Sequence, residues 1–167
     1  MESKTDYRLY AKELRKKLDM KAESAVLAAK IRQNEFYVKA EHVMIFYPVK
    51  YEVDLLELLD DKKNFYLPKV SGKELLVCPF GQNLKKSAFN IMEPCSKPVN
   101  PEVLDLVIVP ALMADKNGFR LGYGGGFYDR FLAGCKVKTI TAIPKELFVD
   151  SLPCEKFDVK IDFVITT

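Results

Sequence analysis

The stretch 107-VIVPALMADKNGFRLGYGGGFYDRFL-132 decides the fold of this chain of 167 residues. With Leu106 before it, it opens on the run LVIVP, which is apolar at every position. A strand without polar side chains must be covered on both faces, as the central strands of α/β sheets are. The stretch then passes a turn at 115–118 and a glycine-rich loop at 122–126, and a helix is expected over 127–134. It therefore predicts a buried central strand whose loop leads into a helix.

Helices and strands alternate on both sides of this unit. Apolar residues at helical spacing predict helices over about 3–18 and 19–37, the second with Asp19 as its N-cap, and a short helix over 53–61. The β-rich runs are VMIFYP at 43–48, NFYLPKV at 64–70, ELLVCPF at 74–80, DLVIVPAL at 105–112, KTITAIP at 138–144 and DFVITT at 162–167. We expect an α/β fold over residues 1–167, a single three-layer domain with a largely parallel or mixed central sheet flanked by helices. Ligands bind such sheets beyond the carboxyl ends of the strands, so the site is expected in the loops after 43–48 and 105–109.

Charge and composition exclude several classes of protein. The net charge of +3 is too small to indicate a nucleic-acid partner, and no apolar run approaches the ~18 residues of a membrane span. Residues 1–40 hold ten basic and six acidic side chains, which indicates either a solvated helix face or an anion site. Four scattered cysteines without a C-x-x-C pair predict reduced thiols and a cytoplasmic location. The one histidine, His42, begins an apolar run, where packing is a better interpretation than catalysis.

The glycine loop is the best candidate for a functional site. Four of the eight glycines lie at 122 and 124–126, and so much lost chain entropy suggests positive φ angles or a close approach to a ligand. Backbone N–H groups in such a loop can hold a phosphate, while the alternative is a flexible turn. Neither G-K-[ST] nor G-x-G-x-x-G is present. Asp129 could hold Mg²⁺ next to such a phosphate, or it could be a helix N-terminal charge or the partner of Arg130.

The sequence RLGYGGGFYDRFL resembles the R-L-G-x-G-x-G-[YF]-Y-D signature of the 5-formyltetrahydrofolate cyclo-ligase family. Four further segments are similar to that family in the same order. They are Lys4-x-x-x-Arg8 with Leu18, FYPVKYEVDL at 46–55, FNIMEP at 89–94, and FDVKIDFVIT at 157–166. One departure is Gly125, which stands where many members have lysine.

The resemblance implies that 5-formyltetrahydrofolate and MgATP are converted to 5,10-methenyltetrahydrofolate, ADP and phosphate. We expect the protein itself to be a cytoplasmic monomer. The resemblance also implies ATP contacts from Lys4, Arg8 and Arg120 and from the loop, and Mg²⁺ held by Asp129 and Asp158. The implied loop residues are Leu121, Gly122, Tyr123, Gly124, Gly125, Gly126, Phe127 and Tyr128, of which Tyr123 to Phe127 would also reach the folate. Glu52 would hydrogen-bond the pterin, Tyr47 and Phe89 would form walls of the pocket, and Arg120, Tyr123 and Asp129 would act in catalysis.

Simpler roles remain open for the residues outside the loop. Lys4 and Arg8 could be solvated, Glu52 could be a helix N-terminal charge, and Asp158 could be a turn residue. Tyr47 and Phe89 could belong to the core. Two other functions also remain open, a non-catalytic nucleotide- or folate-binding protein and a sugar-phosphate isomerase on a related fold.

Overall fold

The computed structural model describes residues 3–81, 83–88 and 90–167. A six-stranded sheet forms the centre, in the order β11-β9-β6-β1-β2-β3. Its strands are parallel except β3, which pairs antiparallel with β2. They are β1 (His42–Met44), β2 (Asn64–Ser71), β3 (Glu74–Pro79), β6 (Leu106–Ile108), β9 (Lys138–Ile143) and β11 (Phe163–Thr166). The predicted α/β fold with a largely parallel sheet is confirmed.

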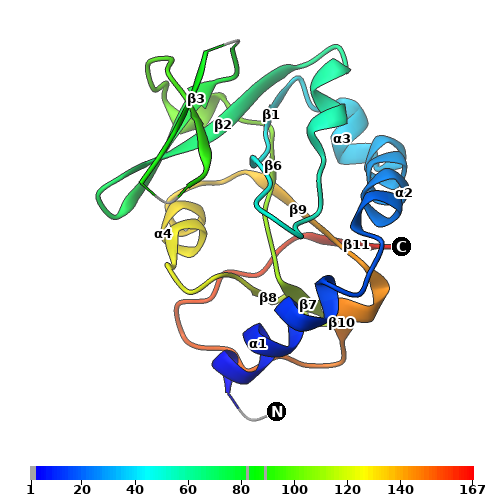
Figure 1. Ribbon diagram of the computed structural model, residues 1–167. Helices are drawn as coiled ribbons and strands as arrows, with labels where there is room; N and C mark the ends of the chain where they lie inside the picture. The colour runs from blue at the N-terminus through cyan, green and yellow to red at the C-terminus, as the bar shows by residue number, and fades with distance from the viewer. Residues whose placement is uncertain (1–2, 82, 89) are drawn as a thin grey trace.

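Helices cover both faces of this sheet, as Figure 1 shows: α2 (Met20–Gln33) and α3 (Glu35–Lys39) lie on one side and α4 (Phe127–Ala133) on the other. The side chains of the strands alternate between the two faces, as a period of two requires. Leu106 and Ile108 of β6 pack with the α2 side, and Val107 packs with Leu132 of α4. All three strand residues are fully buried, so β6 is the central strand that its apolar sequence predicted.

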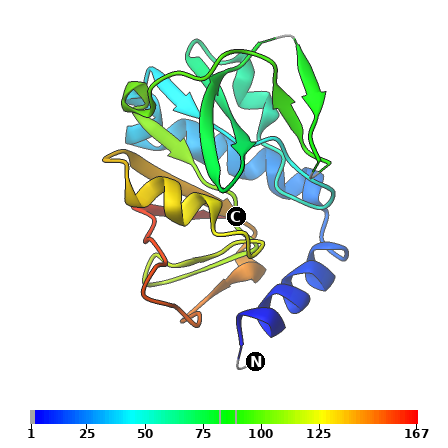
Figure 2. The ribbon, with the colours of Figure 1, turned by 90° about the vertical axis from the view of Figure 1, so that its left-hand side faces the viewer.

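A second, smaller sheet lies at one end of the molecule, in the order β10-β7-β8. Helix α1 (Lys4–Arg15) packs against it through the buried Ala11, and Figure 2 shows both at the same end of the fold. The strands are β7 (Met113–Asp115), β8 (Arg120–Leu121) and β10 (Phe148–Val149). The turn expected at 115–118 joins β7 to β8, with Gly118 at φ +85°. A separate hairpin pairs β4 (Leu84–Lys86) with β5 (Met92–Pro94).

Several element boundaries differ from the sequence prediction. The helix expected over 19–37 is broken at Asn34, whose side chain accepts the N–H of Phe36 and caps a new helix. The segment expected to be helical over 53–61 forms a 3₁₀ helix, η1 (Leu56–Asp60). Short 3₁₀ turns also occur as η2 (Pro101–Val103) and η3 (Lys145–Leu147). Strand β6 ends before Pro110, and the chain then enters the small sheet instead of continuing to 112.

Three observations bear on the remaining sequence expectations. His42 begins β1, and its Nδ1 lies 2.8 Å from the hydroxyl of Tyr66, which is the packing position that was expected. All four cysteines are free thiols. Within the described residues, no helix is both long enough and apolar enough to cross a membrane.

Candidate active site

A pocket of about 560 Å³ opens beyond the carboxyl ends of β1 and β6. It reaches from helix α1 through the glycine loop to the wall made by β2, β3 and the hairpin of β4 and β5. Every site residue expected from the sequence lines it, with the exception of Phe89, which is outside the described residues. These are Lys4, Arg8, Tyr47, Glu52, Arg120, Leu121, Gly122, Tyr123, Gly124, Gly125, Gly126, Phe127, Tyr128, Asp129 and Asp158.

The glycine loop has the backbone that its composition predicted. Gly124 lies at φ +107° and Gly126 at φ +66°, conformations that residues with a Cβ rarely adopt. Arg8 reaches from α1 and donates from Nε to the carbonyl oxygen of Gly122 at 2.9 Å, which holds the loop against the helix. Among the described residues, the N–H groups of 122–126 donate to no backbone carbonyl. These N–H groups are therefore available to a bound anion.

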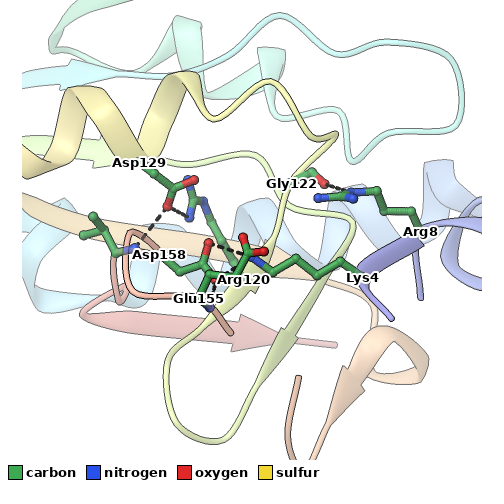
Figure 3. A network of polar contacts seen from close by, with 8 residues as sticks. Lys4, Arg8, Arg120, Gly122, Asp129, Glu155 and Asp158 are labelled. Atoms are coloured by element: carbon green, nitrogen blue, oxygen red, sulfur yellow. Dashed lines mark hydrogen bonds and ion pairs between the residues drawn. The ribbon is translucent and has the colours of Figure 1, made fainter. Parts of the chain in front are cut away.

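The ring of Phe127 lies against the position from which a side chain at Gly125 would begin. A Cβ at this position would come within 2.8 Å of two ring carbons of Phe127. A side chain at 125 would therefore require the aromatic ring to move. The guanidinium groups of Arg8 from α1 and Arg130 from α4 instead lie against the loop, at Gly124 and Gly126, and Figure 3 shows Arg8 beside Gly122.

Arg120 and Asp129 form an ion pair beside the loop. Arg120 Nη1 donates to Asp129 Oδ1 at 2.9 Å, and the same oxygen accepts the backbone N–H of Val159 at 3.0 Å (Figure 3). The alternative pairing of Asp129 with Arg130 is wrong, because Arg130 instead donates from Nε to the carbonyl of Lys73. The Arg120 side chain is only 3% exposed, and its Nε has no hydrogen-bond partner within the described residues. A buried donor without a partner is available to a ligand.

Lys4 and Asp158 form a second ion pair at the same end of the pocket. Lys4 Nζ lies 2.6 Å from Asp158 Oδ2 and 2.8 Å from Glu155 Oε2. Burial alone would lower the pKa of Lys4, but the hydrogen bonds to these two carboxylates outweigh it and raise the pKa above the ordinary lysine value. Asp158 also accepts the N–H of Glu155, so it is a turn residue as well as a pocket residue. A solvated role for Lys4 is therefore wrong.

Glu52, the residue expected to bind the pterin, is a buried carboxylate that is 7% exposed. Its Oε2 accepts the N–H of Val49 at 2.9 Å, and its Oε1 accepts the hydroxyl of Tyr123 at 3.0 Å. Burial raises the pKa of Glu52, and the hydrogen bond from Val49, the charge of Arg15 and the Tyr123 hydroxyl oppose that rise. Burial also raises the pKa of Tyr123, with the Glu52 charge as the next cause.

Sequence reasoning missed part of the pocket wall. The missed residues that line it are Phe46, Val49, Pro68, Val70, Leu75, Ile91, Glu93, Pro110 and Glu155. Most of them are apolar, and nothing in the sequence distinguishes such residues from residues of the core. Glu93 is buried, and its Oε1 accepts the N–H of Val70 at 3.0 Å. It lies in FNIMEP, a segment in which the resemblance implied a role for Phe89 and none for Glu93.

The carboxylates at the charged end of the pocket have the chemistry that Mg²⁺ requires. Within the described residues, no three His, Cys, Asp or Glu side chains are grouped closely enough to form a metal site. Mg²⁺, however, is commonly held by one or two carboxylates together with phosphate oxygens and water. Asp129 and Asp158 line the same pocket, and Oδ2 of Asp129 accepts no hydrogen bond from the described residues. This donor set fits Mg²⁺ once a phosphate is present.

The fold and the site are those of an α/β enzyme that acts on small molecules, with a glycine-rich loop and paired charges lining one pocket. The model of the 5-formyltetrahydrofolate cyclo-ligase family matches residues 2–167. The chain therefore belongs to the 5-formyltetrahydrofolate cyclo-ligase family and is an enzyme of that family.

Individual relatives agree with this assignment. The 5-formyltetrahydrofolate cyclo-ligase of Mus musculus is 27% identical over 86% of this chain and 81% of its own length. That of Haemophilus influenzae is 31% identical over 74% of each chain. The NMR structure of 5,10-methenyltetrahydrofolate synthetase from Aquifex aeolicus superposes with a TM-score of 0.86 at 30% identity, covering 98% of this chain and 89% of the other.

Proposed function

We propose that the protein converts 5-formyltetrahydrofolate and ATP to 5,10-methenyltetrahydrofolate, ADP and phosphate. The observation that carries this proposal is one pocket with two chemically different parts. One part holds the cations Lys4, Arg8 and Arg120 next to the glycine loop, and the other holds the buried Glu52. The first part suits a polyphosphate and the second suits a ring with N–H donors. Four free cysteines accord with a reducing compartment such as the cytoplasm.

The reaction needs no nucleophile from the protein. The formyl group on N5 is an amide, so its oxygen is a poor leaving group and its carbon is a poor electrophile. Transfer of the γ-phosphoryl group to the formyl oxygen corrects both faults. N10 of the same substrate then attacks the formyl carbon, loses its proton, and expels inorganic phosphate as the ring closes. The protein has only to align the two substrates and to stabilise negative charge.

The cationic part of the pocket has the groups for that task. Arg120 lines the pocket and its buried Nε has no hydrogen-bond partner among the described residues, while Arg8 is already fixed against the loop. The backbone N–H groups of 122–126 add further hydrogen-bond donors, which the loop already holds in position. Donors fixed before the reaction stabilise developing charge without the reorganisation that water would need.

The ring of the folate would lie against the other part of the pocket. A carboxylate accepts from the adjacent N–H groups of a pterin, and both oxygens of Glu52 are already fixed in position. Phe46, Tyr47 and Pro68 supply apolar surface for the ring. Asp129 and Asp158 would hold Mg²⁺, which would neutralise phosphate charge when bound.

One experiment tests the proposal and distinguishes it from its alternatives. The protein is incubated with 5-formyltetrahydrofolate and Mg²⁺, with and without ATP, and the absorbance of the methenyl product is followed. We expect the product only with ATP, at one ADP per methenyl group. Binding of folate or nucleotide without product would indicate the non-catalytic alternative. Absence of both binding and product would contradict the assignment of this pocket.

A further inference from the structure

Arg15 is a buried cation that the proposed reaction does not use. It is 2% exposed, and it lies on the same face of α1 as Lys4, Arg8 and Ala11, because the spacings of four, seven and eleven residues return to one side of a helix. A buried arginine is costly unless its N–H groups find acceptors. The contacts it makes therefore indicate its role.

The guanidinium of Arg15 contacts two segments of the active site. Its Nη2 donates to the carbonyl oxygen of Ala111, in the segment that leaves β6. Its Nη1 donates to the hydroxyl oxygen of Tyr123 in the glycine loop, at 3.2 Å. The first contact anchors the guanidinium to the backbone, and the second directs it at a side chain that lines the pocket.

The Tyr123 hydroxyl links Arg15 to Glu52 through two hydrogen bonds. A tyrosine hydroxyl has one proton, so a hydroxyl that accepts from Arg15 has that proton free to donate. It donates to Oε1 of Glu52 at 3.0 Å, while the backbone N–H of Val49 holds Oε2. Both oxygens of Glu52 are thus fixed, one by the backbone and the other by a chain of two hydrogen bonds that begins at Arg15.

We propose that Arg15 is a positioning residue for the folate: acting through the Tyr123 hydroxyl, it orients the Glu52 carboxylate toward the pterin ring. This inference rests on the proposed function, in which Glu52 binds that ring. Helix α1 then serves both parts of the pocket. Lys4 and Arg8 face the nucleotide, and Arg15 acts on the folate side from the last turn of the same helix.

The role requires arginine and not merely a positive charge. The planar guanidinium presents donors in a fixed fork, so it can hold Ala111 and Tyr123 together, whereas a lysine ammonium is a flexible point charge. The charge has its own effect as well. Among the described residues, Arg15 from α1, Tyr123 from the loop and Tyr128 from α4 interact electrostatically with Glu52, and Arg15 is the cation of these three. The charge of Arg15 therefore lowers the pKa of Glu52, against the rise that burial causes.

A double-mutant cycle tests whether Arg15 acts through Tyr123. The dissociation constants of 5-formyltetrahydrofolate, without nucleotide, and of ATP are measured by calorimetry for Arg15→Lys, Tyr123→Phe and the double variant. We expect Arg15→Lys to weaken folate binding roughly 10-fold and to leave ATP binding within about twofold, since one hydrogen bond to a charged network is lost. In the Tyr123→Phe background, Arg15→Lys should have no further effect on folate. Lys12→Met, an exposed cation on the same helix, is the control.

The pH dependence separates positioning from a merely structural role. Arg15→Gln removes a charge that lowers the pKa of Glu52, so the pH below which folate affinity falls should rise in this variant and rise less in Arg15→Lys. Arg15→Gln also replaces Arg15→Lys in the cycle if the lysine variant does not fold.

Three results would overturn the inference. They are unchanged folate affinity in Arg15→Lys, equal weakening of folate and ATP, or an undiminished effect of Arg15→Lys in the Tyr123→Phe background. Failure of the proposed function would be seen separately, because the unaltered protein would then not bind 5-formyltetrahydrofolate or form its methenyl product.

Discussion

Lys4 and Asp158 are 154 positions apart in the chain, yet Lys4 Nζ lies 2.6 Å from Oδ2 of Asp158. The contact joins a residue expected to bind phosphate to one expected to hold Mg²⁺. Each side chain is only 17% exposed, so neighbouring residues hold the pair in place and largely shield it from solvent. In the proposed complex the ammonium turns from the carboxylate to a phosphate, and the carboxylate becomes available to the metal. The ion pair therefore keeps both groups in place for the nucleotide.

Replacing Lys4 and Arg8 together by alanine should weaken ATP binding far more than folate binding. Each substitution removes a charge-assisted contact to phosphate. The loss of two such contacts corresponds to roughly a 100-fold rise in the KM for ATP. The KM for 5-formyltetrahydrofolate should change by about twofold or less. Steady-state kinetics with each substrate varied in turn measures both effects, and Lys12→Ala is the control. An equal effect on both substrates would contradict the phosphate role.

Asp129→Asn should remove turnover while the protein stays folded. The amide keeps an oxygen to accept the Val159 N–H but loses the charge that Mg²⁺ requires, so we expect kcat to fall about 100-fold or more. Loss of the ion pair with Arg120 should lower the melting temperature by only a few degrees. Asp158→Asn should have a similar but smaller effect on kcat. Unchanged activity and unchanged Mg²⁺ dependence in Asp129→Asn would show that the metal is held elsewhere.

The sequence predicted the parts of the fold that have a strong pattern. The apolar run of β6 and the glycines before α4 were sufficient to place the central strand and the loop. The small sheet was missed, because strands of two or three residues such as β8 and β10 are too short to show a period. Arg15 was missed for a different reason. One more cation in a basic helix has no distinguishing local signal, and only the fold brings it to Tyr123.

Glu52 should make the stability of the protein depend on pH in a defined direction. Burial raises the pKa of Glu52 above its ordinary value of 4.5, so the native state retains this proton to a higher pH than the unfolded chain does. The resulting stabilisation is complete below about pH 4.5 and is lost as the pH rises through the folded-state pKa. Glutamine cannot ionise. The melting temperature of Glu52→Gln relative to the unaltered protein should therefore increase between about pH 4 and pH 8.

Circular dichroism melts at several pH values measure this difference, and folate affinity should fall in the same variant. Asp54→Asn is a control, because Asp54 is exposed and close in sequence. A melting-temperature difference that is constant with pH would mean that Glu52 ionises as easily in the fold as in the unfolded chain.

Gly124→Ala and Gly122→Ala should differ although both add one methyl group to the same loop. Gly124 lies at φ +107°, where a Cβ is strained, and we expect a cost of about 1–3 kcal/mol together with a raised KM for ATP. Gly122 is not in the positive-φ region, and a Cβ there would have no atom within 4 Å, so Gly122→Ala should have the smaller effect on both quantities. Thermal unfolding and ATP kinetics measure the two variants side by side. Equal losses would show that the loop rearranges freely.

In the proposed reaction the oxygen of the formyl group accepts the γ-phosphoryl group. With ¹⁸O in the formyl group, the label should appear in inorganic phosphate, measured by mass spectrometry. A route in which a side chain is phosphorylated first would instead release the oxygen as water, and it would need a general acid at the formyl group. The one histidine, His42, is not among the residues that line the pocket and contacts Tyr66 instead. Unlabelled phosphate or a trapped phosphoenzyme would overturn the mechanism and leave the choice of substrate standing.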